Sequence, residues 1–385
     1  MLARRLQGIP PTIFSEMSAL AVHTGSLNLG QGFPDADGPP EVIAEAVAAL
    51  ESGHNQYAPG IGVTLLRQAV ARHQRHHYGL DLDPDSQVVV TTGCTEGIAA
   101  ALLGLVDPGD EIVVLEPYYD SYVAMIQVAG GVRRPVTLRA PDFRLDLDEL
   151  RAAMTTRTRF LLVNSPHNPT GTVLTPAELD AIAAVAIEHD LVVITDEVYE
   201  HLAFGGHEHR PLATLPGMFE RTLTLSSAGK SYSFTGWKVG WATGPAPLVG
   251  AVLAAKQWLT FTSGAPLQPA VALALDEHRD FPTALAKDLE ERRDLLCAGL
   301  RDAGLTTFTP DGTYFAMTDV SELGWEDGMA FCRALPERAG VVAIPAQVLY
   351  DDRAAGRHLV RWAFCKDRSV ITEAAARLAA ADLLT

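Results

Sequence analysis

The feature that most constrains the fold is a regular alternation of short β-branched apolar runs with longer amphipathic segments. Five runs have the length and composition of buried strands, namely 87–91, 111–115, 158–163, 191–195 and 222–226. The segments between them, such as 175–186, have helical spacing. Continuous apolar strands separated by helices are typical of a mostly parallel sheet that is covered on both faces. We therefore predict an α/β fold in which ligands bind beyond the carboxyl ends of the strands.

The pattern changes after about residue 276. A long charged helix is expected over about 280–303, followed by two strand-like pieces at 313–317 and 358–362 and an Ala-rich closing helix. These elements predict a smaller α+β domain. We accordingly expect an N-terminal arm over 1–30 that packs with the small domain, a large domain over 31–275 and the small domain over 276–385.

Composition and charge limit the partners. The formal net charge of -17 argues against affinity for nucleic acid or anionic membranes, because their phosphates would be repelled. The N-terminus lacks an apolar run of signal-peptide length, and no stretch approaches the roughly 18 apolar residues of a membrane helix. We therefore expect a cytoplasmic protein. The cysteines form no C-x-x-C pair, which predicts reduced thiols and no metal site: Cys94, Cys297, Cys332 and Cys365.

Lys230 is the candidate reactive residue. It follows a strand-like run on a turn of small residues, with Ser227 three positions before it and Lys238 eight positions after it. An amine beside a hydroxyl and a second cation suits attack on a carbonyl carbon next to a phosphate. That is the Schiff-base chemistry of pyridoxal phosphate (PLP). The alternative interpretation is a solvated surface lysine.

Residues at other strand ends suit the remaining parts of this cofactor. The segment 92–95 opens a helix directly after a strand, where free N–H groups and the helix dipole favour a phosphate, although a glycine turn with a threonine cap is the simpler alternative. Asp196 offers a carboxylate to a pyridine nitrogen, or caps a helix. Tyr199 and Asn168 suit the phenolic oxygen, and Tyr119 suits stacking on a flat ring.

Eight motifs occur in order along the chain: Asn-Leu-Gly-Gln-Gly-Phe-Pro-Asp (28–35), Asn-Gln-Tyr-Ala-Pro-Gly (55–60), Glu-Pro-Tyr-Tyr-Asp-Ser-Tyr (116–122), Asn-Ser-Pro-His-Asn-Pro-Thr-Gly (164–171), Asp-Glu-Val-Tyr (196–199), Ser-Ser-Ala-Gly-Lys (226–230), Gly-Trp-Lys-Val-Gly-Trp (236–241) and Val-Arg-Trp-Ala-Phe (360–364). Over nearly its whole length the chain resembles a fold-type I, class I/II PLP-dependent aminotransferase. Within that class it is most similar to the kynurenine, glutamine and methionine aminotransferases and to the N-succinyldiaminopimelate aminotransferases.

The resemblance implies a role for each matched residue. Lys230 would form the Schiff base, Asp196 would bind the pyridinium nitrogen, and Tyr199 would hold the phenolic oxygen. The other implied cofactor contacts within one chain are Gly93, Cys94, Thr95, Tyr119, Asn164, Asn168, Ser227 and Lys238. Tyr57 would reach across a homodimer interface to the partner's phosphate. The implied substrate contacts are Arg361 at the α-carboxylate, Gly32, Asn168 and, at the side-chain pocket, Phe14.

The implied reaction is ping-pong transfer of an amino group from an L-amino acid to a 2-oxo acid, in which Lys230 moves the Cα proton. The candidate donors are methionine, glutamine, aromatic amino acids and N-succinyl-LL-2,6-diaminopimelate. The stretch 261–266 is expected to line the side-chain pocket, and it lacks the aromatic–His pair of some kynurenine aminotransferases.

Other reactions stay open at this point. β-Elimination from cysteine conjugates and biosynthetic cyclisation use the same cofactor cradle. Two interpretations that do not involve PLP fail because the chain lacks a second sequence feature that each of them requires. Residues 227–230 fit the S-x-x-K of serine hydrolases, but the chain contains neither S-D-N nor K-T-G. Residues 229–231 resemble the end of a nucleotide-binding P-loop, but position 224 is Thr where that motif needs Gly.

Overall fold

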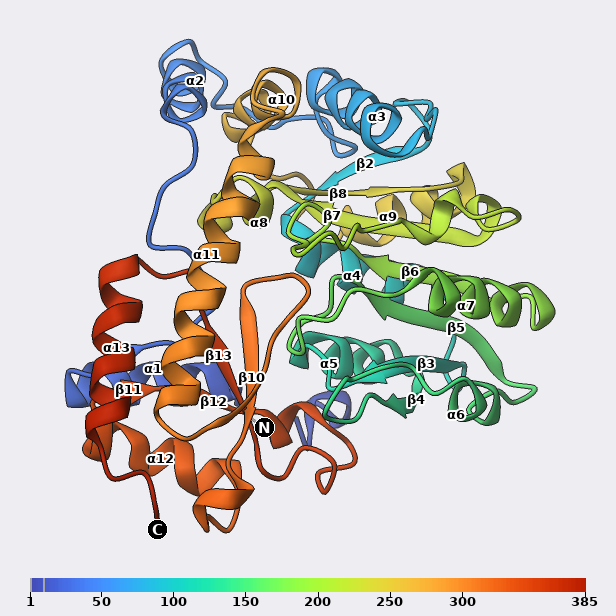
Figure 1. The fold of residues 1–385 in the computed structure, drawn as a ribbon. Helices are drawn as coiled ribbons and strands as arrows, with labels where there is room; N and C mark the ends of the chain where they lie inside the picture. Colours follow the sequence, from blue (N-terminus) through green and yellow to red (C-terminus); the bar gives the residue numbers. More distant parts are fainter. Residues whose placement is uncertain (1, 10) are drawn as a thin grey trace.

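A seven-stranded sheet forms the centre of the chain in a computed structural model that describes residues 2–9 and 11–385 (Figure 1). The strand order is β2-β8-β7-β6-β5-β3-β4. In the described residues, only β8 runs antiparallel to its neighbours in this sheet. The predicted mostly parallel α/β sheet is therefore confirmed. Its strands are β2 (Val88–Thr91), β3 (Glu111–Glu116), β4 (Val132–Thr137), β5 (Thr158–Asn164), β6 (Val192–Asp196), β7 (Thr222–Ser227) and β8 (Gly240–Thr243).

Helices cover both faces of this sheet, because successive apolar residues of a strand point to opposite sides. On β3, Ile112 and Val114 join one buried cluster, whereas Val113 and Leu115 join another. The first cluster includes α4 (Gly93–Leu105), α5 (Asp120–Ala129) and α9 (Ala246–Lys256). The second includes α6 (Leu147–Ala152) and α7 (Pro176–Glu188). A reciprocal capping box between Thr175 and Glu178 starts α7 where the sequence predicts a helix.

A third buried cluster lies over the β2–β8 end of the sheet. It is formed with α2 (Pro40–Glu51), α3 (Thr64–Tyr78) and α10 (Leu267–Glu277), and α10 packs against both other helices. Figure 1 shows these three helices together above β2. The short helix α8 (Ala228–Ser231) and the 3-10 turn η4 (Thr235–Trp237) follow β7 and connect it to β8.

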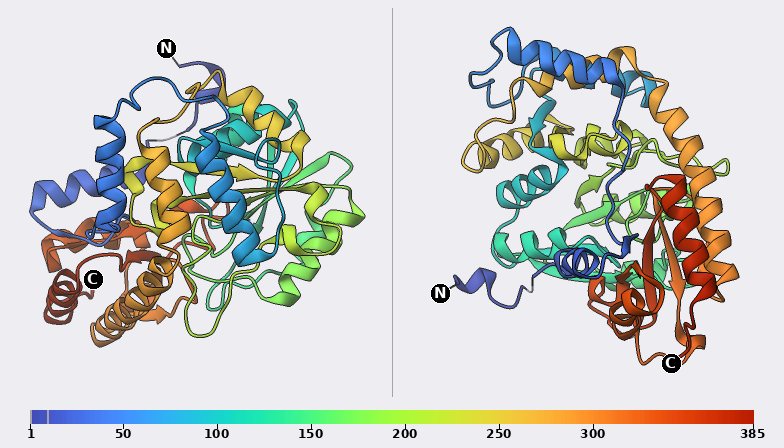
Figure 2. Two further views of the ribbon diagram at one scale, coloured as in Figure 1. Left: turned by 90° about the horizontal axis from the view of Figure 1, so that it is seen from above. Right: turned by 90° about the vertical axis from the view of Figure 1, so that its left-hand side faces the viewer.

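The C-terminal third builds a second, four-stranded sheet in the order β12-β13-β10-β9. The helix α11 (Phe281–Asp302) leads into it, at the position that the sequence predicts. Its strands are β9 (Thr306–Phe308), β10 (Phe315–Asp319), β12 (Ile344–Pro345) and β13 (Leu359–Ala363), and its helices are α12 (Gly328–Ala339) and α13 (Arg368–Ala380). The two views in Figure 2 show the red C-terminal elements grouped beside the large sheet.

The N-terminal segment joins these C-terminal elements. The strand β1 (Leu27–Asn28) pairs in parallel with β11 (Val341–Val342), and α1 (Ile13–Thr24) packs against α12 and β11. Met17 and Ala21 on α1 are buried in the same cluster as Phe331 and Leu335 on α12. The first residues of the chain therefore lie against some of the last ones.

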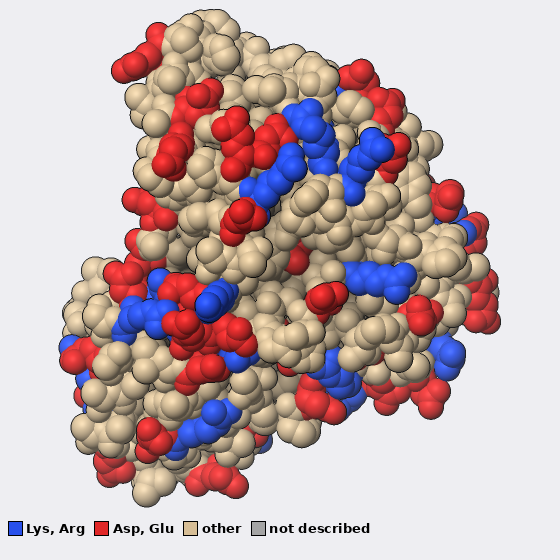
Figure 3. Space-filling view, turned by 45° about the horizontal axis from the view of Figure 1, so that its top comes forward, with Lys and Arg blue, Asp and Glu red and all other residues tan. Residues whose placement is uncertain are grey.

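Charged side chains of both signs are interspersed on the surface. On the face drawn in Figure 3, Lys and Arg side chains lie close to Asp and Glu side chains, and acidic groups extend beyond them. A broad, purely basic surface is not seen on this face, in keeping with the net charge of -17. In the described part of the chain, no helix combines the length and the apolar character needed to cross a membrane.

Candidate active site

A cavity of about 420 Å³ opens at the carboxyl ends of the parallel strands, where an α/β sheet is expected to bind its ligands. Residues at or just after the ends of five strands, β2, β3, β5, β6 and β7, meet there, together with residues from the N-terminal segment, β10 and β13. The structure brings together all but one of the sequence-predicted site residues: Phe14, Gly32, Gly93, Cys94, Thr95, Tyr119, Asn164, Asn168, Asp196, Tyr199, Ser227, Lys230, Lys238 and Arg361.

One wall of the cavity has the chemistry of an anion site. The helix α4 begins at Gly93, whose φ of 70° is a left-handed conformation that glycine adopts without strain. A Cβ on Gly93 would lie 3.3 Å from Nζ of Lys238, so the amine is close to the helix start. Among the described residues, no carboxylate lies within 4.0 Å of Lys238. Free N–H groups of a helix start and an unpaired ammonium together favour a phosphate.

Asp196 is a buried carboxylate at the end of β6, with 5% of its surface exposed. The Tyr122 hydroxyl donates to its Oδ2 at 2.6 Å, and the Val198 N–H donates to its Oδ1 at 3.3 Å. Burial raises the pKa of Asp196, while the hydrogen bond from Tyr122 and the charge of Lys230 oppose that rise. A carboxylate held this way is suited to pair with a cationic ring nitrogen.

Lys230 lies on α8, and its amine faces the cavity. Its Nζ donates to the Gly32 carbonyl at 3.5 Å and lies 5.8 and 5.5 Å from the ring centroids of Tyr199 and Tyr314. Burial lowers the pKa of Lys230 to about 8. Roughly a tenth of the amine is therefore uncharged at pH 7, far more than for an ordinary lysine, and the neutral amine is the form that acts as a nucleophile or general base.

Arg361 on β13 is a buried cation with 2% of its surface exposed. Its guanidinium donates to Asn168 Oδ1 at 3.1 Å and to the Gly30 carbonyl at 2.7 Å, and it lies 4.7 and 4.0 Å from the ring centroids of Phe14 and Phe315. Its Nε has no hydrogen-bond partner. Burial lowers the pKa of Arg361 to about 10, so it is still protonated at neutral pH.

The described residues place no carboxylate within 4.0 Å of this guanidinium. A buried, charged and incompletely paired guanidinium is costly unless a ligand supplies the anion. Because its fork matches a carboxylate in two parallel hydrogen bonds, Arg361 suits the α-carboxylate of an amino acid.

The asparagine loop after β5 joins these groups. Asn164 Nδ2 donates to the main-chain oxygen of Asp196 at 2.8 Å, and its Oδ1 accepts from the Asn168 N–H at 2.7 Å. Asn168 in turn accepts from Arg361. These hydrogen bonds thus connect the main chain of Asp196 at the end of β6 with the buried cation of β13.

Sequence reasoning gave no role to three residues that shape this site. Tyr122 hydrogen-bonds Asp196, Tyr314 donates to the Gly32 carbonyl at 2.5 Å, and Phe315 packs under Arg361. Tyr122 ends the motif 116–122, and the other two lie in the strand-like piece 313–317. Their roles depend on contacts between residues at least 45 positions apart in the chain, which spacing does not reveal.

Tyr57 is the predicted site residue that does not line this cavity. Its side chain is 84% exposed and its ring meets that of Phe261 edge-on at 5.4 Å. The stretch 261–266 was expected to line the side-chain pocket, but none of its residues lines this cavity of the single chain. The physical reason is that Lys256 Nζ donates to the carbonyls of Gly60 and Phe261, each at 3.1 Å, which ties this stretch to the Tyr57 loop.

The donor set fits PLP. The cavity offers an amine for its aldehyde, a buried carboxylate for its ring nitrogen and a helix start with Lys238 for its phosphate. A Cβ on Gly240 would come within 2.8 Å of Gly93 and 2.9 Å of the Cys94 nitrogen, so a glycine on β8 leaves room for the helix start. The unpaired charges of Lys238 and Arg361 suit the two anions, phosphate and carboxylate, that such a reaction brings together.

Comparison with known proteins agrees with this geometry. The chain is 52% identical to a probable N-succinyldiaminopimelate aminotransferase DapC of Mycobacterium tuberculosis, over 98% of each chain. It is 39% identical to a methionine aminotransferase of Escherichia coli, over 97% of each. A solved structure of N-succinyldiaminopimelate aminotransferase from M. tuberculosis matches with a TM-score of 0.96, covering 98% of this chain and 99% of that one.

The family model "Aminotransferase class I and II" matches residues 24–378. That range holds every residue of the cavity named above except Phe14, and it contains both sheets. The chain therefore belongs to the class I and II aminotransferases, which are PLP-dependent enzymes.

Proposed function

We propose that this chain catalyses ping-pong transamination between an L-amino acid and a 2-oxo acid, with Lys230 as the residue that carries the proton. The observation behind the proposal is that one cavity holds a partly buried amine, a buried carboxylate and an incompletely paired, buried guanidinium: Lys230, Asp196 and Arg361. A hydrolase of the S-x-x-K type has no use for the last two groups in that arrangement.

When bound, PLP supplies an aldehyde for the amino group and an electron sink for the charge left at Cα. Asp196 supplies the negative charge that keeps the ring nitrogen protonated, and Tyr122 holds that carboxylate in place. Lys230 Nζ takes the proton from the substrate Cα as a general base. It then donates that proton as a general acid. The pKa of about 8 suits a group that must accept and release a proton near neutral pH.

Arg361 orients the substrate. Its free donors bind the α-carboxylate in a bidentate manner, which fixes the Cα–H bond relative to the lysine amine. The Gly32 carbonyl, which accepts from both Lys230 and Tyr314, marks where the N-terminal segment closes over the site. A Cβ on Gly32 would approach Phe315 to 2.5 Å, so only glycine leaves the segment this close.

The first candidate for the amino donor is N-succinyl-LL-2,6-diaminopimelate, because the relative that shares 52% identity with this chain is named for it. The lining offers a specific reason for a second candidate. In the described lining, the three cations are Lys230, Lys238 and Arg361, while Phe14, Ile98 and Phe315 are apolar. These surroundings favour an uncharged side chain such as that of methionine. The distal carboxylates of the first donor would need a cation from a second subunit.

A panel of amino donors tests the proposal. The purified holoenzyme is assayed with N-succinyl-LL-2,6-diaminopimelate, methionine, glutamine, kynurenine and phenylalanine, each with 2-oxoglutarate and pyruvate as acceptors. We expect stoichiometric formation of the new amino acid and the new 2-oxo acid, and at least about a 100-fold loss of kcat in Lys230→Ala. Release of ammonia and pyruvate from cysteine conjugates without an acceptor would instead establish a β-lyase.

We propose that the working form is a homodimer with shared sites. Apolar side chains are exposed around the Tyr57 loop: Tyr57 at 84%, Trp258 at 83%, Leu259 at 47% and Phe261 at 50%. A contiguous exposed apolar surface is typical of an interface. The Tyr57 loop then reaches the phosphate of the partner subunit, as the resemblance implies.

The division into an arm over 1–30, a large domain over 31–275 and a small domain over 276–385 belongs to the same proposal. The two separate sheets support it, as does the pairing of β1 with β11. Cytoplasmic residence stays a prediction from the sequence.

A further inference from the structure

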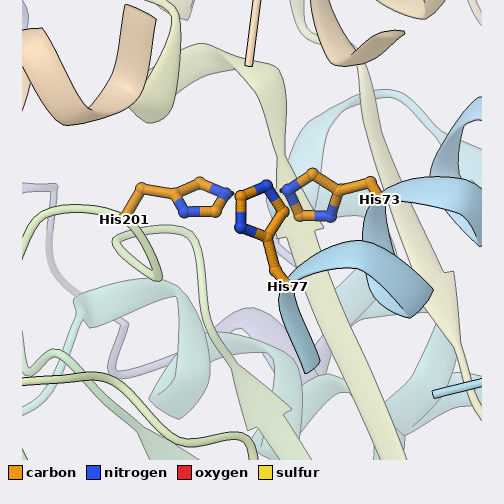
Figure 4. Close-up of side chains that lie close together, drawn as sticks. All are labelled: His73, His77 and His201. Carbon is orange, nitrogen blue, oxygen red and sulfur yellow. Dashed lines mark hydrogen bonds between the residues drawn. The ribbon is translucent and has the colours of Figure 1, made fainter. Parts of the chain in front are cut away.

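Three imidazoles meet outside the cavity described above. His73 and His77 lie one turn apart on α3, and His201 lies in the turn that follows β6. One ring nitrogen of each lies within 4.8 Å of those of the other two. Figure 4 shows the rings of His73 and His201 pointing toward each other, with the ring of His77 beside the gap between them. His73 is buried, His201 is partly buried and His77 is exposed, so the cluster is open to solvent on one side.

The three rings make few hydrogen bonds with one another. Nε2 of His73 lies 2.7 Å from Nε2 of His201, so one hydrogen bond at most joins the pair, and His77 has no hydrogen bond in the described structure. Burial lowers the pKa of His73 to about 3 and that of His77 to about 4, so these rings are neutral at pH 7. Neutral imidazoles present lone pairs, which is the form that binds metals.

A buried carboxylate beside the cluster lacks a cation. Glu200 is 5% exposed, and it accepts hydrogen bonds from the hydroxyls of Tyr78, at 2.6 Å, and Ser226. Within the described ranges, no lysine, arginine or histidine nitrogen lies within 4.0 Å of it. Burying an unpaired carboxylate is costly, and a divalent ion held by the neighbouring imidazoles would supply the missing positive charge.

We propose that His73, His77 and His201 bind a divalent transition-metal ion of the zinc class. Two residues four apart on a helix face the same side, and a third ligand from another element completes the three-histidine set of an open tetrahedral site. Imidazole nitrogens select Zn²⁺, Ni²⁺ or Cu²⁺ over Mg²⁺ and Ca²⁺, which prefer oxygen ligands. Nitrogens bound to one tetrahedral zinc lie about 3.3 Å apart, so the His73–His201 pair has to separate by roughly half an ångström.

A neighbouring amide is placed to orient one ligand. The Gln74 side chain lies 3.5 Å from Nδ1 of His73, and its Oε1 is buried without a hydrogen-bond partner. We expect this amide to turn over in the metal-bound form, so that Oε1 accepts from Nδ1–H. That bond leaves the lone pair on Nε2 for the metal, as an outer contact of a zinc-bound histidine usually does.

The site would lie directly behind the cofactor cradle. Glu200 follows Tyr199, and Ser226 precedes Ser227 on β7. The His73 ring is also 6.4 Å from the ring of Trp241, which follows the Gly240 that packs on the start of α4. Because these residues are outside the cavity, the metal ion would stabilise the cradle and take no part in proton transfer. Loss of the metal should therefore lower the unfolding temperature and leave the cofactor bound.

The test is metal binding by the chelator-treated, dialysed holoenzyme. Stoichiometry is measured by elemental analysis, and affinity for Zn²⁺ by competition with a chromophoric chelator. We expect one zinc ion per chain, and a rise in unfolding temperature with zinc. We expect weakening of at least about tenfold in His77→Gln and in His201→Gln. His76→Gln is the matched control, because His76 is exposed on the same helix and lies outside the trio.

Three results would overturn the proposal. One is the absence of bound zinc after zinc has been added back and the excess dialysed away, which would mean that the trio binds no metal. Another is equal zinc affinity in the wild type and in both ligand variants. The third is loss of the metal in step with cofactor removal, which would place it on the cofactor. His77→Gln is expected to fold because His77 is exposed, and unchanged cofactor absorbance confirms that the fold is intact.

Discussion

At the scale of single residues, Arg361 shows how burial prepares a side chain for a ligand. Its charge is kept by two hydrogen bonds and two aromatic faces, yet its Nε has no partner. The protein tolerates this cost because the substrate carboxylate removes it during each turnover. Lys238 differs, because it is exposed and its ammonium serves through its position beside the start of α4.

Replacing Arg361 with lysine should therefore impair substrate binding. A lysine keeps the charge but cannot form the two parallel hydrogen bonds, and it lacks the planar group that packs between Phe14 and Phe315. We expect kcat/KM to fall roughly 10- to 100-fold for every amino donor, from loss of charged hydrogen bonds worth about 1.5–3 kcal/mol. Steady-state kinetics measure this. Arg333→Lys, at an exposed pair with Glu16, is the control and should leave kcat/KM unchanged.

His167 should make stability depend on pH. Its side chain is 3% exposed, its Nδ1 lies 2.7 Å from Thr170 Oγ1, and burial lowers its pKa to about 4. The unfolded chain takes up a proton on this residue below about pH 6.5, whereas the folded chain does so only near pH 4. Stability is therefore lost as the pH falls through that window.

We expect the free energy of unfolding to drop by roughly 2 kcal/mol more in the wild type than in His167→Gln between pH 7.5 and pH 5. Urea unfolding at the two pH values measures the difference. An equal drop in both proteins would show that His167 is protonated in the folded state as readily as in the unfolded state.

Most of the residues that line the candidate active site could be predicted from the sequence. Lys230, Asp196 and the 92–95 turn follow strands, and a parallel sheet gathers such residues at one edge. Tyr122 and Tyr314 were not predictable in the same way. An aromatic residue in an apolar segment reads as core, and only the folded chain shows that one hydroxyl contacts Asp196 and the other contacts Gly32.

At the scale of elements, β8 is a strand that the sequence analysis does not predict, because it is short and begins with glycine. It is four residues long, and it pairs antiparallel with both β2 and β7. In this position Gly240 packs on the first turn of α4. The strand β4 escaped prediction for a different reason. It holds two arginines and a proline at the edge of the sheet, where proline costs no hydrogen bond of the sheet.

Gly240→Ala should loosen the cofactor. The new methyl group would press on Gly93 and on the Cys94 nitrogen, and strain of about 1–3 kcal/mol would be relieved by moving the start of α4. We expect the PLP dissociation constant to rise about tenfold, measured by cofactor titration of the apoenzyme. Gly250→Ala on α9 is the matched control, since a Cβ there has nothing within 4 Å. An unchanged dissociation constant in Gly240→Ala would contradict the role given to this contact.

At the scale of the whole molecule, the site lies where distant parts of the chain meet. Phe14 from α1, Asp196 from the large sheet and Arg361 from the small sheet all line one cavity. The two-sheet architecture could be inferred from the change of pattern near residue 276. The packing of the N-terminal segment on α12 was expected as part of the arm, but its contacts are between residues more than 300 positions apart and lie beyond what periodicity reveals.

The shared-site proposal predicts complementation between two inactive chains. Lys230→Ala lacks the reactive amine and Tyr57→Ala lacks the group that reaches the partner. In a mixed dimer one of the two sites has both residues intact. Co-expression should therefore restore about a quarter of wild-type activity, because random pairing makes half of the dimers mixed. Activity no greater than the average of the two parent variants would contradict shared sites.

The central claim is that Lys230 is the amine that holds the cofactor. Treating the holoenzyme with borohydride fixes PLP to the lysine that carries it, and peptide mass mapping then identifies that lysine. We predict a single modified peptide that contains Lys230, and none in Lys230→Ala treated in the same way. Modification of Lys238, Lys256 or another lysine in the wild type, with Lys230 unmodified, would contradict the account.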